Sequence, residues 1–182
     1  MNRASVLTIV GTHAGETIEE IILRKQQEIS KLGYTFWLYK SHSAKPTIVQ
    51  EMAKTHKINT YLINASSLSG AKPTTEKALA RLYSTDKHNW DAIPSGLIVT
   101  GLSKGAFALV FKNIRILDNE VIDLWDYSDY SNPQDPVRFR LGNSTIPVIQ
   151  KSSMNSSNKI KSNIRKVIAV GELKKPFCVY VQ

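Results

Sequence analysis

Residues 5–33 read SVLTIVGTHAGETIEEIILRKQQEISKLG, and this stretch decides how the rest of the chain is interpreted. The apolar run at 6–10 is long enough for a buried strand and too short for a helix. A polar loop with two glycines follows it. Thr17 and Glu20 then have the spacing of an N-terminal capping box, and Gly33 is a typical helix C-cap. The stretch therefore predicts a strand, a loop and a well-capped helix.

The predicted helix has one apolar face, formed by Ile18, Ile21, Ile22, Ile29 and Leu32. We expect this face to pack against the core. The first amide groups of a helix have no partner inside the helix, so they are suited to an anion. We therefore expect an anionic group to bind near Thr17.

Four apolar runs alternate with helical patterns over the first hundred residues. The runs at 6–10, 35–39, 58–63 and 97–100 predict strands, and the segments 17–32, 46–56 and 74–84 predict helices. Strands that alternate with helices are typical of βαβ units. We predict an α/β fold with a mainly parallel sheet and helices in residues 5–100.

The pattern changes after residue 101, where we predict no long helix. Six β-like runs are separated by turn residues, at 106–116, 121–125, 137–141, 145–149, 167–170 and 177–181. We predict that residues 101–182 form a mixed or antiparallel β extension packed on the first half. Residues 1–182 then form a single domain.

Composition limits the class of protein. The 182 residues are 42% hydrophobic and 21% charged, which is ordinary for a globular protein. No apolar run approaches the roughly 20 residues that a membrane helix needs, and the start of the chain has no signal-peptide pattern. Cys178 is the single cysteine, which excludes an internal disulfide framework. We expect a cytoplasmic protein without a membrane partner.

The net charge of +9 is distributed unevenly along the sequence. Residues 151–182 contain seven basic side chains and one acidic side chain, whereas residues 118–135 contain six acidic side chains and no basic one. A basic region of this kind favours a polyanionic partner.

If the four predicted strands are parallel, the loops after them, at 11–16, 40–45, 64–75 and 101–105, meet at one edge of the sheet. Ligands of open α/β sheets usually bind at this edge, outside the carboxyl ends of the strands. These loops are rich in ammonium and hydroxyl groups and nearly free of carboxylates. We therefore predict an anionic, phosphate-bearing or nucleotide-like ligand in this crevice. The candidate ligand-binding residues are Thr12, Lys40, Lys45, Lys72, Thr74 and Lys104.

Acid–base chemistry in the same crevice has three candidate residues. His13 and His42 follow successive predicted strands, and Glu16 is placed to orient a histidine or to act as a base. Whether a reaction follows from these residues is left open, and no cofactor is indicated. The histidines and Cys178 do not have zinc-ligand spacing, so we predict no metal site.

Two alternative functions come from the charge distribution. The first is a nucleic-acid-binding module that uses Lys159, Lys161, Arg165 and Lys166. The second is a homo-oligomeric interaction protein, in which the acidic strip of one copy meets the basic tail of another.

Overall fold

The computed structural model describes residues 4–10, 15–39, 46–55, 58–64, 79–99, 106–130, 132, 148–151 and 164–182. Within these residues the chain forms nine strands, two α-helices and one 3-10 helix. In chain order they are β1 (Ser5–Val10), α1 (Ile18–Leu32), β2 (Thr35–Tyr39), α2 (Pro46–Thr55), β3 (Asn59–Asn64), β4 (Leu82–Ser84), β5 (Asp91–Ala92), β6 (Phe107–Asp123), η1 (Leu124–Asp126), β7 (Tyr127–Asp129), β8 (Val148–Lys151) and β9 (Ile164–Val181).

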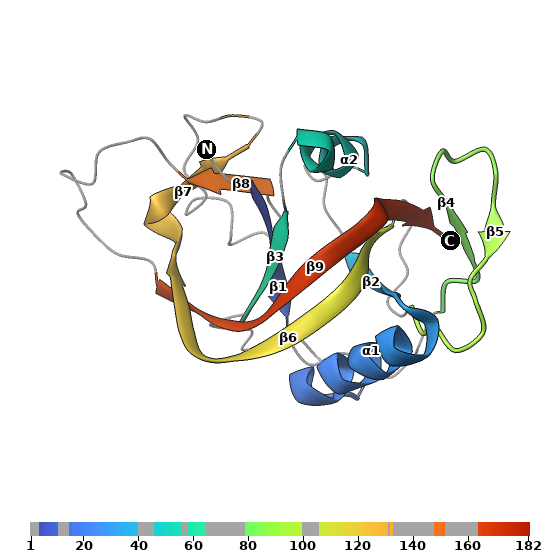
Figure 1. Cartoon of the computed structure of the whole chain (residues 1–182), viewed down its shortest axis with the longest axis horizontal. Helices are drawn as coiled ribbons and strands as arrows, with labels where there is room; N and C mark the ends of the chain where they lie inside the picture. Colours follow the sequence, from blue (N-terminus) through green and yellow to red (C-terminus); the bar gives the residue numbers. More distant parts are fainter. Residues whose placement is uncertain are drawn as a thin grey trace.

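One curved sheet contains all of these strands, in the order β2-β6-β9-β3-β1-β8-β7, with β4 paired to β9 and β5 paired to β4. Figure 1 shows β6 and β9 as two long, curved strands that run side by side through the molecule. Among the described strands, β1 and β3 are the parallel neighbours. Every other described pairing is antiparallel.

The prediction of a mainly parallel α/β fold was therefore wrong. It assumed that strands separated by a helix would become neighbours in the sheet. Instead, β2 pairs with β6 at one edge, and β9 lies between β6 and β3. The two long strands of the second half thus lie between β2 and β3. Apolar runs reveal that strands exist, but they carry no direct information on strand direction or order.

Three local predictions also needed correction. Leu82–Ser84, expected in a helix, is a strand that pairs with β5 and β9. The segment at 97–99 is not a strand, although Leu97 and Val99 are buried. The runs predicted separately at 106–116 and 121–125 belong mostly to the single strand β6.

Among the described residues the core consists of three apolar clusters. Both helices contribute to the first of them, since Ile22 of α1 and Met52 of α2 pack with Leu62 of β3 and Phe111 of β6. The second cluster contains Phe36 and Val179, and the third contains Leu7 and Leu124. Because neighbouring residues of β2 and β9 belong to different clusters, apolar side chains cover both faces of these strands.

Side-chain amides tie each helix to the sheet. Gln26 of α1 donates to the Ile114 carbonyl at 2.9 Å, and Gln50 of α2 donates to the Cys178 carbonyl at 3.2 Å. These bonds fix the helices over β6 and β9. Neither helix in the described part of the chain is both long and apolar enough to span a membrane.

The helix predictions for the first half are confirmed in two places. Thr17 caps α1 in a complete capping box, and Gly33 ends the helix with a left-handed φ of 77°. Helix α2 lies where the segment 46–56 was predicted to be helical. The expected inner position of Leu32 is not observed, since this side chain is exposed.

Candidate functional site

Helix α1 buries two charged side chains as well as its isoleucines. Lys25 and Glu28 are each 4% exposed, and their side chains form an ion pair at 3.0 Å. Charged side chains are seldom buried to this extent unless they are paired. The pair therefore marks the face of α1 where its polar contacts concentrate.

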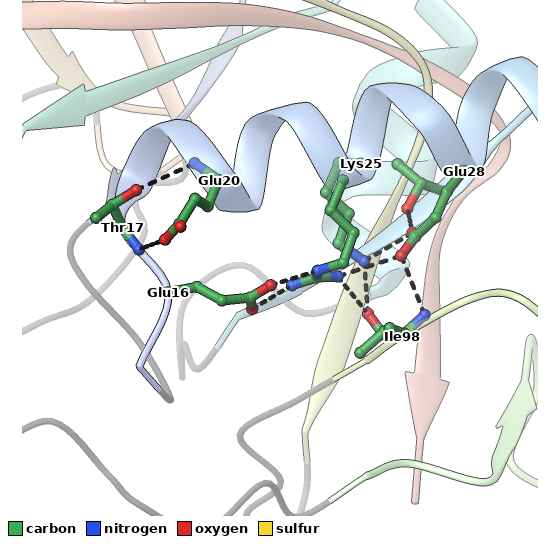
Figure 2. Close-up of polar contacts among 8 residues, drawn as sticks. Glu16, Thr17, Glu20, Lys25, Glu28 and Ile98 are labelled. Carbon is green, nitrogen blue, oxygen red and sulfur yellow. Dashed lines mark hydrogen bonds and ion pairs between the residues drawn. The ribbon is translucent and has the colours of Figure 1, made fainter.

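The Glu28 carboxylate accepts hydrogen bonds from four groups. Arg24 Nη1 donates at 3.2 Å, Lys25 Nζ at 3.0 Å and the Ile98 backbone amide at 3.2 Å. The fourth donor is the Thr35 hydroxyl at the start of β2. Figure 2 shows Lys25 and Glu28 pointing together toward the Ile98 backbone. One carboxylate thus joins α1 to β2 and to the segment at 97–99.

Arg24 is held from the other side by Glu16. Its Nε and Nη2 atoms donate to the two oxygens of Glu16, each at 2.8 Å, in a bidentate pair. Arg24 also donates weakly to the Ile98 carbonyl, at 3.4 Å. The hydrogen bonds with Glu16 raise the pKa of Arg24 above its ordinary value, against the effect of burial. We call the side chains of Glu16, Arg24, Lys25, Glu28 and Thr35 the α1 network.

Burial has the opposite effect on the second cation of the network. It lowers the pKa of Lys25 from 10.5 to about 8, although the Glu28 carboxylate favours the charged form. Lys25 Nζ also donates to the Ile98 carbonyl at 2.6 Å. With two cations and two carboxylates, the α1 network is balanced in charge and its groups have hydrogen-bonding partners.

A surface hollow of about 270 Å³ lies beside this network. Helix α1 forms one wall and the turn before the segment at 97–99 forms the other. The turn is closed by a hydrogen bond from the Leu97 amide to the Pro94 carbonyl, and Gly96 occupies its left-handed position with a φ of 96°. The lining residues are Arg24, Gln27, Glu28, Lys31, Leu32, Ser95, Gly96 and Ile98.

The charges of the hollow are not balanced like those of the network. Its carboxylate, Glu28, is bonded by the four donors described above, and Arg24 is held by two carboxylates. Lys31 is exposed and has no ion-pair partner among the described residues. The rim therefore carries an uncompensated positive charge.

At the N-terminal end of α1, where an anionic group was expected to bind, backbone amides already have partners from the chain itself. The Thr17 amide donates to Glu20 at 2.7 Å, and the Glu20 amide donates to the Thr17 hydroxyl at 3.2 Å. Figure 2 shows Glu16 and Glu20 beside this first turn, and Glu19 lies within it. Glu19 and Glu20 place negative charge in this turn, and Glu20 already accepts from the Thr17 amide, so this end is unfavourable for an anionic ligand.

The strand ends that were expected to share one crevice do not lie at one edge of the sheet. The last residues of β1 and β3, Val10 and Asn64, are neighbours, so these two strands end at the same edge. The last residue of β2, Tyr39, instead pairs with Phe107, the first residue of β6. Because β6 and β3 run in the same direction, these two places are at opposite ends of the strands. The premise of one shared crevice was wrong.

Most of the predicted site residues lie outside the described part of the chain. The structure describes Glu16, whose two carboxylate oxygens bind Arg24, and it describes Arg165 and Lys166 of β9. The others lie outside the described residues: Thr12, His13, Lys40, His42, Lys45, Lys72, Thr74, Lys104, Lys159 and Lys161.

Arg165 and Lys166, the two described residues of the four that were predicted to bind nucleic acid, lie next to the acidic strip of the same chain. Arg165 pairs with Ile122 and Lys166 with Val121, between Glu120 and Asp123 in the β6/β9 ladder. Opposite charges on paired strands offset each other. This arrangement weakens the proposals of nucleic-acid binding and of homo-oligomerisation through these particular residues.

Sequence reasoning missed the α1 network and the hollow. Arg24 and Glu28 have the i, i+4 spacing of a helical ion pair, and this signal is present in the sequence. It does not distinguish a buried pair from an exposed one, and the contacts with Thr35 and Ile98 depend on tertiary structure. Comparisons with protein-family models, curated proteins and solved structures gave no match to this chain.

Proposed function

We propose that the protein binds a small ligand with an anionic group, a phosphate or a carboxylate, in the hollow beside α1. The observation that carries this proposal is Lys31, a cation without an ion-pair partner among the described residues, at the rim of a hollow whose lining carboxylate is already bonded. An anionic group beside Lys31 gains a charge-assisted hydrogen bond without having to displace an existing ion pair.

The other lining residues suit such a ligand. Gln27 and Ser95 supply exposed polar side chains at the rim, and Leu32 and Ile98 supply apolar contacts. The volume of about 270 Å³ is slightly below the usual range for drug-sized ligands, so a small metabolite or one end of a larger molecule is expected. The α1 network supports the site because it fixes the floor of the hollow.

The proposal concerns binding and assigns no reaction to the hollow. Its lining residues do not include a histidine or a cysteine, and Glu28 is fully engaged as an acceptor. We also propose a cytoplasmic location. The cysteine content supports it, because a chain with one cysteine, Cys178, has no internal disulfide, as is usual in a reducing compartment.

A thermal-shift screen tests the proposal. We would titrate the whole protein with inorganic phosphate, nucleotides, phosphorylated sugars and dicarboxylates, and follow the melting temperature. A ligand at a hundred times its Kd stabilises the folded state by about 2.7 kcal/mol. Lys31→Gln should abolish or strongly reduce the shift.

Lys54→Gln is the matched control, because Lys54 is also an exposed lysine in the last turn of a helix. A shift that survives in Lys31→Gln would place the ligand elsewhere, whether or not Lys54→Gln also keeps it. If no compound in the panel shifts either the wild type or the control, the proposal fails.

A further inference from the structure

The positive charge at Lys31 continues beyond the hollow, across the C-terminal end of α1. Lys174 Nζ lies 3.9 Å from the position that a Cβ atom on Gly33 would take, and Gly33 is the C-cap of the helix. The same ammonium group lies 5.1 Å from the centre of the Tyr34 ring. Lys175 follows in β9 and is exposed. We call Lys31, Lys174 and Lys175 the lysine track.

The carboxylates nearest in sequence to the lysine track do not neutralise it. Glu28 is buried in the α1 network, and Glu172 binds Lys112 at 2.6 Å. None of the track lysines has an ion-pair partner among the described residues. The C-terminal end of a helix carries about half a negative charge, so the two ammonium groups of Lys31 and Lys174 exceed what this end needs, and Lys175 adds an exposed charge at the next position of β9. The excess is available to a polyanion.

We propose that the hollow and the lysine track together bind single-stranded nucleic acid. One phosphate occupies the hollow beside Lys31, and neighbouring phosphates of the same strand contact Lys174 and Lys175. This inference rests on the proposed function, because it fills the same hollow and names the class of ligand.

A single strand fits this surface better than a duplex. Its flexible backbone can place one phosphate into a small hollow while the next phosphates follow the lysines, whereas a duplex holds its phosphates on a stiff cylinder. Tyr34 adds an aromatic ring beside Lys174, and the centre of the Phe36 ring is 5.6 Å from the centre of the Tyr34 ring. Binding of this kind does not depend strongly on sequence.

Fluorescence anisotropy with a labelled oligothymidylate of about 12 nucleotides tests the inference on the whole protein. The affinity should fall as salt rises, because each neutralised phosphate releases counterions. The double variant Lys174→Gln/Lys175→Gln should bind more weakly and lower the slope of log K against log salt by about 1.4. Lys54→Gln/Arg115→Gln removes the same net charge from two exposed positions outside the track and should behave like the wild type.

The outcomes separate this inference from the proposed function. Small anions that bind in a Lys31-dependent manner, with no oligonucleotide binding, would overturn the inference and leave the proposed function in place. Oligonucleotide binding that is unchanged in the Lys174/Lys175 variant would also overturn it, as would tighter binding to duplex DNA or to phosphatidylserine vesicles. If neither small anions nor the oligonucleotide bind, both proposals fail.

Discussion

The two ends of α1 differ in how their charges are used. At the N-terminal end, Glu20 closes the capping box with Thr17, and Glu16 binds Arg24. At the C-terminal end, Gly33 caps the helix, while Lys31 and Lys174 lie beside it without ion-pair partners among the described residues. Both ends have the sign of charge that the helix dipole favours. The C-terminal end keeps positive charge that an anionic ligand can use, whereas the N-terminal end keeps negative charge, at Glu19.

This difference shows why a helix N-terminus alone is weak support for an anion site. Free amides and the positive end of the dipole attract anions, but the chain's own carboxylates compete for the same place. In this protein Glu20 accepts from the Thr17 amide at this end of the helix, and its partner lies only three residues away in the chain. The side chains around a helix end therefore decide its function more than the dipole does.

The largest expected effect concerns the α1 network, which holds the helix in position between its two ends. Glu28→Gln leaves Lys25 and Arg24 without their shared carboxylate in a buried place. Removal of one partner from a buried ion pair typically costs about 3–5 kcal/mol. We expect a loss of this size in the free energy of unfolding, measured by urea denaturation at neutral pH. Glu51→Gln, on the exposed face of α2, is the control and should change stability by less than about 0.5 kcal/mol.

A small loss in Glu28→Gln, equal to that of the control, would mean that the network contributes little to the position of α1. The network would then not be what holds the two ends of α1 in place.

The second prediction is a pH dependence caused by Lys25. Its pKa is about 8 in the folded protein and near 10.5 when unfolded, so between these values the unfolded state binds more protons. Stability must then rise with pH, by about 1–2 kcal/mol between about pH 8 and 9.5. The partly buried tyrosines Tyr34, Tyr127 and Tyr180 have raised pKa values and act in the opposite direction above about pH 10.

Chemical denaturation of the wild type and of Lys25→Met at several pH values isolates this contribution. The rise should be present in the wild type and absent in the variant. An identical pH profile for the two proteins would show that the charge of Lys25 is not affected by burial.

The third prediction concerns the capping box at the N-terminal end. Thr17→Ala removes the side chain that accepts from the Glu20 amide, and it should cost about 0.5–2 kcal/mol. Thr47→Ala is the control, because Thr47 is exposed within the first turn of α2. A reversible thermal melt that distinguishes the two variants supports the cap. Equal melting temperatures would contradict it.

The sequence predicted local features of the fold well and its topology poorly. Thr17, Glu20 and Gly33 signal the ends of α1 through contacts within a few residues, so these ends could be placed. The pairing of Tyr39 with Phe107, and of Leu62 with Ala169, joins residues that are far apart in the chain. Apolar runs do not specify such partners. The prediction of a parallel sheet was wrong because it assigned the wrong neighbours to the strands.

The same limit applied to the candidate site. The four loops were grouped because all four strands were taken to be parallel, and the antiparallel pairing of β2 with β6 removed that basis. Lys25 and Glu28 were not recognised because two charged residues on a helix usually face solvent. Their burial follows from the contacts with Thr35 and Ile98, which no local pattern reveals.

The smallest expected effect concerns Lys31 at the C-terminal end of α1. Lys31→Glu replaces an ammonium group with a carboxylate beside the last carbonyls of the helix, so the dipole interaction changes from favourable to unfavourable. We expect a loss of about 0.3–1 kcal/mol in the free energy of unfolding at low ionic strength, and a smaller loss in Lys31→Gln. Both losses should shrink in about 1 M salt, which screens exposed charges. Urea denaturation at two salt concentrations measures them. A loss that does not depend on salt would mean that Lys31 stabilises the fold through packing. The charge of Lys31 would then not be what distinguishes the C-terminal end of α1 from the N-terminal end.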